Sequence, residues 1–168
     1  MNYASIKSHD VANGPGVRVS VFVSGCEHRC PGCFNPETWD FNYGSPFGVG
    51  QIADILSLGG ADYIKGLSIL GGEPLHPSNR ISVLALCNAW KRHYPNKSIW
   101  LYTGYVVEDV PEGGGILKYI DVLVDGPFIE AEKDLSLRFR GSRNQRIIDV
   151  KKSQQAGEVV LWNEEENE

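Results

Sequence analysis

The sequence predicts a single α/β domain built on a mostly parallel sheet. Short runs of β-branched and apolar residues alternate with segments of helical periodicity, and four of the runs end in loops that contain glycine. The chain has 168 residues, enough for one core of ordinary size but too few for two. Strands separated by helical segments imply right-handed crossovers and an open or partly closed sheet.

The elements of the N-terminal half follow from their periodicity. Alternating valines predict a strand over residues 17–23, which runs directly into a cysteine-rich loop. Apolar residues at helical spacing predict a helix over residues 51–58. A short apolar run closed by two glycines predicts a strand over residues 66–70.

The C-terminal half continues the alternation. Ser78 is the predicted cap of a helix that runs to about His93 and ends before a proline. Residues 98–103 and 121–124 are predicted strands, and the proline and three glycines within residues 106–119 predict a short or poor helix there. The apolar face of the longer helix is expected to comprise Ile81, Leu84, Ala85, Cys87 and Trp90.

Four of the predicted strands end in glycine-containing loops, with the sequences SGCEHRCPGC, GGEP, TGY and DGPF. Ligands of parallel α/β folds bind at the carboxyl ends of strands, where loops from several strands converge. We therefore expect these four loops to surround one common site.

The charge pattern disfavours a nucleic-acid or membrane partner. The formal net charge is −5, and four glutamates within residues 163–168 contribute −4 of it, so the body of the chain is nearly neutral. A protein that binds a phosphate backbone needs surplus lysine and arginine. The chain lacks an apolar run of ~18 residues and the charged-then-apolar order of a signal peptide. We expect a cytoplasmic protein with one domain over residues 1–162 and a solvated, frayed acidic tail over residues 163–168.

Three of the four cysteines, Cys26, Cys30 and Cys33, fall within eight residues, whereas Cys87 lies far from them. A disulfide framework spaces its cysteines more evenly, and clustered thiols in a chain without an export signal favour a metal or redox role. Cys87 lies on the apolar face of a predicted helix and is expected to be a buried core residue.

The residues alone leave several interpretations of the thiols open. A zinc site would need His28 as its fourth ligand, although four ligands within one short loop are strained. His28 is otherwise expected to face solvent. An iron-sulfur cube held by three thiolates leaves one iron open for chemistry. Three inert buried thiols are a weaker interpretation, because polar and charged residues surround them.

A thiol-disulfide oxidoreductase is the alternative from another functional class. Cys30 and Cys33 form the C-x-x-C pair that such an enzyme uses, with a thiolate stabilised by a helix N-terminus. Pro36 disfavours a helix that begins at Cys33, and Cys26 would have no role.

The motifs together carry a resemblance to a known family. The C-x3-C-x2-C loop with the following Phe34, and the later Gly71-Gly72-Glu73, resemble the cluster loop and the S-adenosylmethionine (SAM) motif of radical SAM enzymes. More narrowly, the segments NGPG, FVSGCEHRCPGCFNPETW, LGGEPLHPSN, WLYTGY, VLVDGPF and RGSRNQR resemble the activating proteins of anaerobic (class III) ribonucleoside-triphosphate reductases. The likeness extends from the N-terminus to about Ile148.

The resemblance implies an incomplete radical-SAM-type barrel and an iron-sulfur, SAM-dependent activase. A 4Fe-4S cluster would bind Cys26, Cys30 and Cys33, and the amino and carboxylate groups of SAM would chelate the fourth iron. Reductive cleavage of SAM would produce a 5′-deoxyadenosyl radical that removes a hydrogen from a glycine of the reductase. The implied partners are the large chain of the anaerobic reductase and an electron donor of the flavodoxin or ferredoxin type.

The resemblance also implies which residues contact SAM. The glycines after the strand would let the backbone approach the ligand, and Glu73 would accept the hydrogens of the SAM ammonium group. Phe34 would stack on adenine or belong to the core. No catalytic side chain is implied beyond the cluster and SAM. The expected contacts are Gly32, Cys33, Phe34, Gly71, Gly72 and Glu73.

Arg138, Arg140, Arg143 and Arg146 form a local basic cluster in an otherwise acidic chain. A solvated face is the expected role. The alternatives are a docking surface for the reductase or a contact to the SAM carboxylate. A radical SAM enzyme with a different, small substrate is a further alternative, although a chain of this length leaves little room for a separate substrate pocket.

Overall fold

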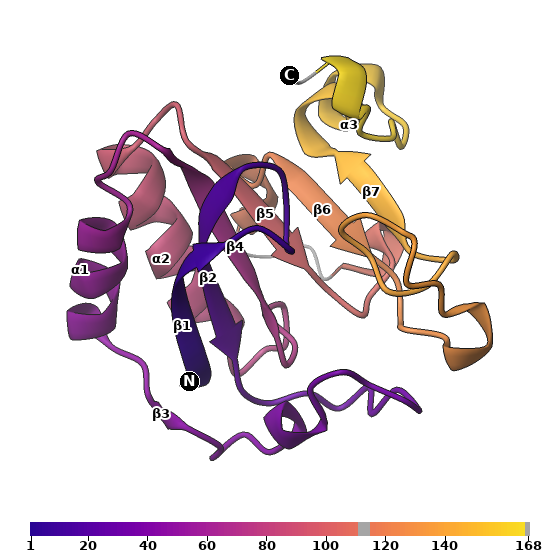
Figure 1. Cartoon of the computed structure of the whole chain (residues 1–168), viewed down its shortest axis with the longest axis horizontal. Coiled ribbons are helices and arrows are strands. Elements are labelled where there is room, and N and C mark those ends of the chain that lie inside the picture. Colours follow the sequence, from indigo (N-terminus) through magenta and orange to yellow (C-terminus); the bar gives the residue numbers. More distant parts are fainter. Residues whose placement is uncertain (111–114, 167–168) are drawn as a thin grey trace.

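The computed structural model of the chain describes residues 1–110 and 115–166. Within these residues, seven strands form one sheet in the order β3-β1-β2-β4-β5-β6-β7 (Figure 1). The strands are β1 (Asn2–Asp10), β2 (Val17–Val23), β3 (Ser45–Pro46), β4 (Ile64–Gly71), β5 (Ser98–Tyr102), β6 (Val122–Asp125) and β7 (Arg146–Asp149). The helices are α1 (Val49–Leu58), α2 (Arg80–His93) and α3 (Val150–Ala156), and 3-10 turns cover Pro36–Trp39, Val107–Asp109, Ile116–Tyr119, Glu130–Glu132 and Glu164–Glu166. In the described ranges, no helix is long and apolar enough to cross a membrane.

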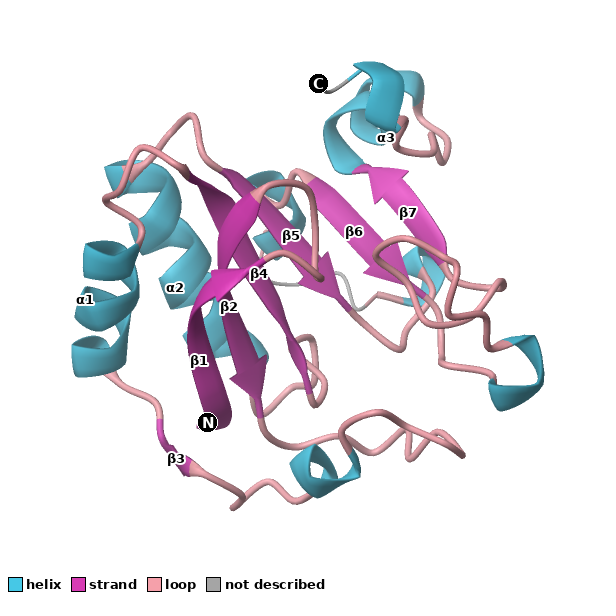
Figure 2. Ribbon diagram, viewed as in Figure 1, coloured by secondary structure: helices cyan, strands magenta, loops and turns pink. Residues whose placement is uncertain are grey.

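The sheet is mixed, with a parallel centre and antiparallel edges. Strands β2, β4, β5 and β6 pair in parallel. Strand β1 pairs antiparallel with β2 and β3, and β7 pairs antiparallel with β6. The prediction of a mostly parallel sheet is therefore correct only for the four central strands. Strands β3 and β7 are the two edges, so the sheet formed by the described residues is not a closed barrel (Figure 2). The incomplete radical-SAM-type barrel stays a prediction.

Alternation of side chains along the central strands divides the sheet into two faces. One face packs against α1 and α2 and forms the main apolar core, with buried residues that include Val21, Ile69 and Leu101. Figure 2 shows both helices together on this side of the sheet. On the opposite face, Phe22, Leu70 and Tyr102 line a cavity together with residues that follow β6. The cavity therefore lies on the face of the sheet opposite α1 and α2.

The helix predicted from Ser78 to about His93 is confirmed as α2, but its cap and its buried face differ from the prediction. Asn79 is the N-cap residue, and its side-chain amide donates hydrogen bonds to backbone carbonyls of the strand-end loops. The predicted face included Ile81 and Ala85, both of which are exposed. The buried face comprises Val83, Leu86, Cys87 and Trp90.

Several elements were not predicted from the sequence. Strand β1 is mostly polar, and most of its residues are only partly buried, since its outer neighbour β3 pairs with two of them. Strand β7 and helix α3 were also missed. The short helix expected within residues 106–119 is confirmed only as two 3-10 turns, and residues 111–114 of that segment lie outside the described residues.

The C-terminal residues pack against the sheet. The backbone N–H of Trp162 donates to the carbonyl of Ile147 at 2.8 Å. The Trp162 ring lies 5.0 Å from the Trp100 ring, in an edge-to-face contact. Glu164 forms an ion pair with Arg138. Trp162 belongs to the predicted domain of residues 1–162. In the predicted acidic tail, Glu164 contacts Arg138 through this ion pair, and the solvated, frayed state of the tail stays a prediction.

Candidate functional site

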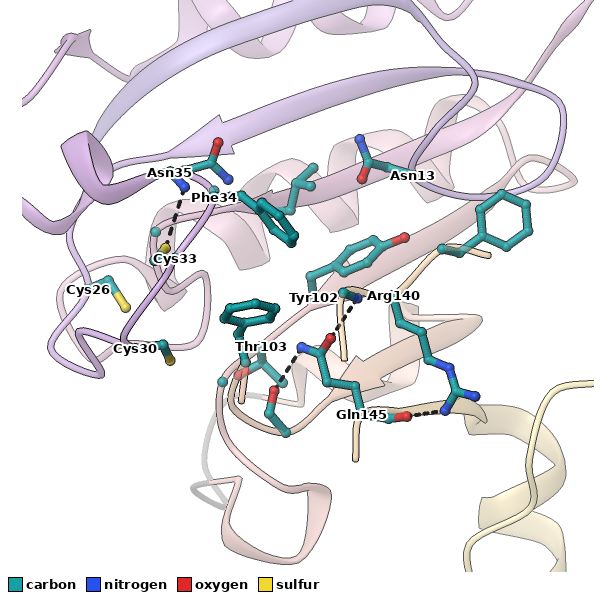
Figure 3. Close-up of a pocket in the computed structure, with 18 of the residues that line it drawn as sticks. Asn13, Cys26, Cys30, Cys33, Phe34, Asn35, Tyr102, Thr103, Arg140 and Gln145 are labelled. Atoms are coloured by element: carbon teal, nitrogen blue, oxygen red, sulfur yellow. Dashed lines mark hydrogen bonds between the residues drawn. The ribbon is translucent and has the colours of Figure 1, made fainter. Parts of the chain in front are cut away.

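The four glycine-containing strand ends line one cavity, as the sequence predicts (Figure 3). The cavity has a volume of about 460 Å³. The carboxyl ends of the parallel strands meet at one edge of the sheet, and so residues far apart in the sequence come together here. The strand-end loops contribute Cys26, His28, Cys30, Cys33 and Phe34 after β2, Gly71, Gly72 and Glu73 after β4, Thr103 and Gly104 after β5, and Gly126 and Phe128 after β6.

The segment from Cys26 to Cys33, which we call the thiol loop, is anchored at its first residue and contains a turn at its end. The backbone N–H of Cys26 donates to the carbonyl of Trp39 at 3.2 Å. The backbone N–H of Cys33 donates to the carbonyl of Cys30 at 3.1 Å and closes a turn. The 3-10 turn after the loop begins at Pro36, so no regular helix starts at Cys33, as predicted. These contacts hold the three thiols on one wall of the cavity, where Figure 3 shows them.

The environment of the thiols disfavours disulfide chemistry. Cys26, Cys30 and Cys33 are free and partly exposed, whereas Cys87 is fully buried in the core, as predicted. Burial raises the pKa of Cys26 and of Cys30. A thiol-disulfide oxidoreductase lowers the pKa of its attacking thiol. The pKa of Cys30, one cysteine of the C-x-x-C pair, is thus shifted away from the direction that this alternative requires.

The thiols of the cavity differ in what a single metal ion and an iron-sulfur cube would require of them. In the described part of the chain, no three side chains of histidine, cysteine, aspartate or glutamate are arranged to hold one metal ion. A zinc site needs its ligands to converge, because each thiolate binds the same ion at about 2.3 Å. In an iron-sulfur cube each iron takes its own thiolate, so the sulfurs lie further apart. The three thiols that line this cavity are the number that a cube with one open iron requires.

Two glycines let the loop after β4 approach the end of β2. Gly71 has a φ of +106°, which favours glycine, and an added Cβ at Gly72 would lie 2.7 Å from the carbonyl oxygen of Gly25. The backbone N–H of Gly72 donates to Val23 at 2.7 Å, and that of Glu73 donates to Gly25 at 2.8 Å. The two loops are thus joined backbone to backbone, which brings the Glu73 side chain to the thiol loop.

Glu73 is a buried carboxylate, 1% exposed, whose oxygens accept four hydrogen bonds. Oε1 accepts from the backbone N–H of Leu75 at 2.9 Å and from the Thr103 hydroxyl at 2.8 Å. Oε2 accepts from the backbone N–H of Gly104 at 2.8 Å and from Nε2 of His28 at 2.9 Å. Four donors fill the ordinary capacity of a carboxylate. A SAM ammonium group at this side chain would have to displace one of them.

His28 does not face solvent, in contrast to the prediction. Its side chain is 23% exposed, and its ring lies edge-on to the Tyr105 ring with centroids 4.6 Å apart. The hydrogen bond to Glu73 raises the pKa of His28 and outweighs the opposing effect of burial. An added Cβ at Gly104 would lie 2.5 Å from Cδ2 of His28, so glycine leaves the space that the ring occupies. Sequence reasoning noticed this histidine but could not find its partner.

Gly32 and Phe34, the two neighbours of Cys33, differ in their position relative to the cavity. Phe34 lines the cavity, is 54% exposed, and lies 5.0 Å from the Phe128 ring. An exposed aromatic face is suited to stacking on a planar group. Gly32 is absent from the described cavity lining, and an added Cβ there would lie 2.7 Å from a carboxylate oxygen of Glu130. Phe34 therefore lies in the cavity and Gly32 lies outside its described lining, and the contacts of both residues to SAM stay predictions.

The segment after β6 forms the far wall of the cavity. Gln145 Oε1 accepts from the backbone N–H groups of Gly141 and Ser142 at 2.9 and 3.2 Å, and its Nε2 donates to the carbonyl of Gly126 at 3.1 Å. The Arg140 guanidinium donates to the backbone carbonyl of Gln145. Figure 3 shows both side chains on the wall that faces the thiols. The RGSRNQ segment thus shapes the cavity through its own hydrogen bonds.

The four arginines of the predicted basic cluster have separate partners, and Arg138 and Arg143 are 66% and 69% exposed, so a solvated face, a docking surface and a contact to the SAM carboxylate stay predictions. Strand β7 and the loop before it direct them to separate partners. Of these arginines, Arg140 appears in the described cavity lining. Arg138 pairs with Glu164, Arg140 with backbone carbonyls of Arg143 and Gln145, Arg143 with Asp134, and Arg146 with Asp125 and Glu108.

Comparisons with known proteins agree with this geometry. A family model described as a 4Fe-4S single cluster domain matches residues 12–148. The anaerobic ribonucleoside-triphosphate reductase-activating protein of Enterobacteria phage T4 is 43% identical over 149 residues, which cover 88% of this chain and 93% of that protein. The chain belongs to this family of activating proteins. Its members from Vibrio cholerae and Escherichia coli K12 are 44% and 43% identical over 150 residues, which cover 88% of this chain and 97% of each relative.

Membership in the activating-protein family supports an iron-sulfur cluster as the cofactor, because the matched 4Fe-4S domain contains the whole thiol loop. Helix α3 and the C-terminal residues lie beyond the end of that match. Two residues of the site, Thr103 and Gly104, were missed individually, although the TGY segment that contains them was expected at the mouth. The sequence feature that could have identified them is the glycine that directly follows a predicted strand.

Proposed function

We propose that this chain holds a 4Fe-4S cluster on Cys26, Cys30 and Cys33, binds SAM in the adjoining cavity, and generates a glycyl radical on an anaerobic ribonucleoside-triphosphate reductase. The carrying observation is that these thiols and the Gly71-Gly72 loop line the same cavity of about 460 Å³. This volume falls within the ~300–1,000 Å³ of small-molecule sites. The names of the relatives support the reductase as the partner.

The bound cluster would supply the electron that cleaves SAM to methionine and a 5′-deoxyadenosyl radical, which takes a hydrogen atom from a glycine of the reductase. The residues of the chain would bind and orient the cluster and SAM and would shield the radical from solvent. The thiol loop offers three thiolates and leaves one iron for the amino and carboxylate groups of SAM. A flavodoxin- or ferredoxin-type protein would provide the electron in the cytoplasm.

The contacts proposed for SAM follow from the cavity walls. Phe34 lines the cavity and is 54% exposed, so its ring is suited to stack on adenine beside the Lys133 ammonium group, which lies 5.1 Å from the ring centroid. The carboxylate of Glu73 already accepts four hydrogen bonds. The backbone of Gly71 and Gly72, which lines the cavity without a side chain, is therefore the better candidate for the SAM amino group.

Anaerobic reconstitution tests the proposal. The wild-type chain should bind about four irons and, with dithionite and SAM, release 5′-deoxyadenosine. Cys26→Ala, Cys30→Ala and Cys33→Ala should each abolish the stable cluster, whereas Cys87→Ala should leave it intact. Full iron content in Cys30→Ala, or loss of the cluster in Cys87→Ala, would refute the ligand assignment.

The partner is tested separately by electron paramagnetic resonance. With the reductase added, a glycyl radical signal should appear on the reductase. A thiol-disulfide oxidoreductase would bind no iron after proper reconstitution. A radical SAM enzyme with a different substrate would release 5′-deoxyadenosine without the signal.

A further inference from the structure

We propose that His28 and Glu73 form a latch that positions the thiol loop against the loops after β4 and β5. The proposal rests on the proposed function, since the latch would orient the cluster ligands relative to the SAM-binding loop. His28 is then a positioning residue, which acts through the loop rather than by contact with reacting atoms. This assignment replaces both earlier expectations for His28, those of a metal ligand and of a solvent-facing residue.

The latch joins three separate loops through one carboxylate. Glu73 follows β4, and its other donors are the backbone of Leu75 in the same loop and Thr103 and Gly104 after β5. The fourth donor, His28 Nε2 at 2.9 Å, comes from the thiol loop. Two backbone N–H groups can only donate, so both carboxylate oxygens act as acceptors. The loops after β4 and β5 already meet at the Glu73 carboxylate, and the His28 hydrogen bond attaches the thiol loop to the same carboxylate.

The position of His28 makes this contact relevant to the thiols. His28 lies midway between Cys26 and Cys30, whereas the backbone bond from Cys26 to Trp39 lies at the start of the loop and the turn from Cys30 to Cys33 lies at its end. Its ring occupies the space that Gly104 leaves open and contacts the edge of Tyr105. A shift of the ring therefore moves the middle of the loop and both neighbouring thiols.

Loss of the histidine would leave a carboxylate that is 1% exposed with one donor fewer. A hydrogen bond to a buried charged group is worth about a 10- to 100-fold change in the equilibrium between closed and open loop. The glycines proposed to receive the SAM amino group directly precede Glu73 in the sequence. An open thiol loop should therefore weaken SAM binding, while the three thiolates still bind iron.

Three full-length variants test the latch. His28→Ala removes the donor, and His28→Gln restores an amide N–H that can reach Glu73. Glu27→Gln is the matched control, because Glu27 is the neighbouring residue, is 76% exposed, and has its partner His76 at 3.4 Å. Backbone amide hydrogen exchange over residues 26–33 and 103–105 is measured in the metal-free chain. SAM affinity is measured from the spectrum of the reconstituted, reduced protein.

We expect His28→Ala to accelerate exchange in both segments at least about tenfold and to weaken SAM binding by about the same factor. His28→Gln should return both values to within about threefold of wild type, and Glu27→Gln should match wild type. Iron content should be equal in all four proteins.

Unchanged exchange and SAM affinity in His28→Ala would overturn the latch, as would failure of His28→Gln to restore them. Accelerated exchange that also includes α2 would overturn a local positioning role. If the wild-type chain binds neither iron nor SAM, the proposed function fails, while the exchange measurements still decide whether the latch exists.

Discussion

Replacing Arg146 with alanine should destabilise the fold by about 3 kcal/mol. Arg146 begins β7 and lies opposite Asp125, the last residue of β6, in the antiparallel register. Its Nε donates to Oδ1 of Asp125 at 3.0 Å, and the Asp125 side chain is 1% exposed. The outer side of the guanidinium donates to the carboxylate of Glu108 at 3.0 and 2.7 Å. The arginine thus neutralises a buried charge next to the loop that lines the cavity.

The magnitude follows from what the substitution leaves behind. Breaking a buried ion pair costs about 3–5 kcal/mol, because the remaining charge is buried without a partner. The Arg146 side chain is 32% exposed, so water can reach part of the site and the lower end applies. Asp125 keeps one hydrogen bond, from the backbone N–H of Val107 at 2.7 Å. The bond to Glu108 adds little, because that carboxylate is 56% exposed.

Urea unfolding of the reduced, metal-free chain measures this difference in the free energy of unfolding. Arg143→Ala is the matched control, since Arg143 is 69% exposed and pairs with Asp134 at the surface, and it should change stability by less than about 1 kcal/mol. Equal stabilities of Arg146→Ala and Arg143→Ala would refute the reasoning.

Three further predictions concern packing and pH. Gly72→Ala should destabilise the chain by about 1–3 kcal/mol because the added Cβ would meet backbone atoms. In the control Gly50→Ala the Cβ would meet no described atom within 4 Å, and the free energy of unfolding in the same urea assay should change by less than about 1 kcal/mol. Burial alone would raise the pKa of Asp121, but hydrogen bonds from two lysines and a backbone N–H lower it below 3.8. The contribution of the ionised Asp121 to stability is thus complete above pH 3.8 and is lost as the pH falls through the pKa of the folded state. Asp121→Asn should therefore lose less stability on acidification than the wild type, and parallel curves of unfolding free energy against pH would contradict this. Trp162→Ala should cost about 2 kcal/mol through lost packing, and a loss of iron binding in this variant would contradict a purely structural role.

Local patterns in the sequence were sufficient for the central strands and for the composition of the site. Alternating valines identify β2, and glycines after strands mark the edge where the cavity forms. The spacing of Cys26, Cys30 and Cys33 places three thiols on one short loop. These features could be predicted because each depends on residues that are close in the sequence, and because parallel strands bring their carboxyl ends to the same edge.

The tertiary structure decided which polar groups meet. His28 and Glu73 are 45 residues apart, and only the pairing of β2 with β4 and of β4 with β5 brings them within hydrogen-bond distance. The antiparallel position of β7 likewise brings Arg146 to Asp125, which is 21 residues away in the sequence. A charged side chain carries no local signal of its partner, since that partner depends on strand order and register. For this reason the sequence predicted the residues of the site, but the structure was needed to show which of them hold one another in place.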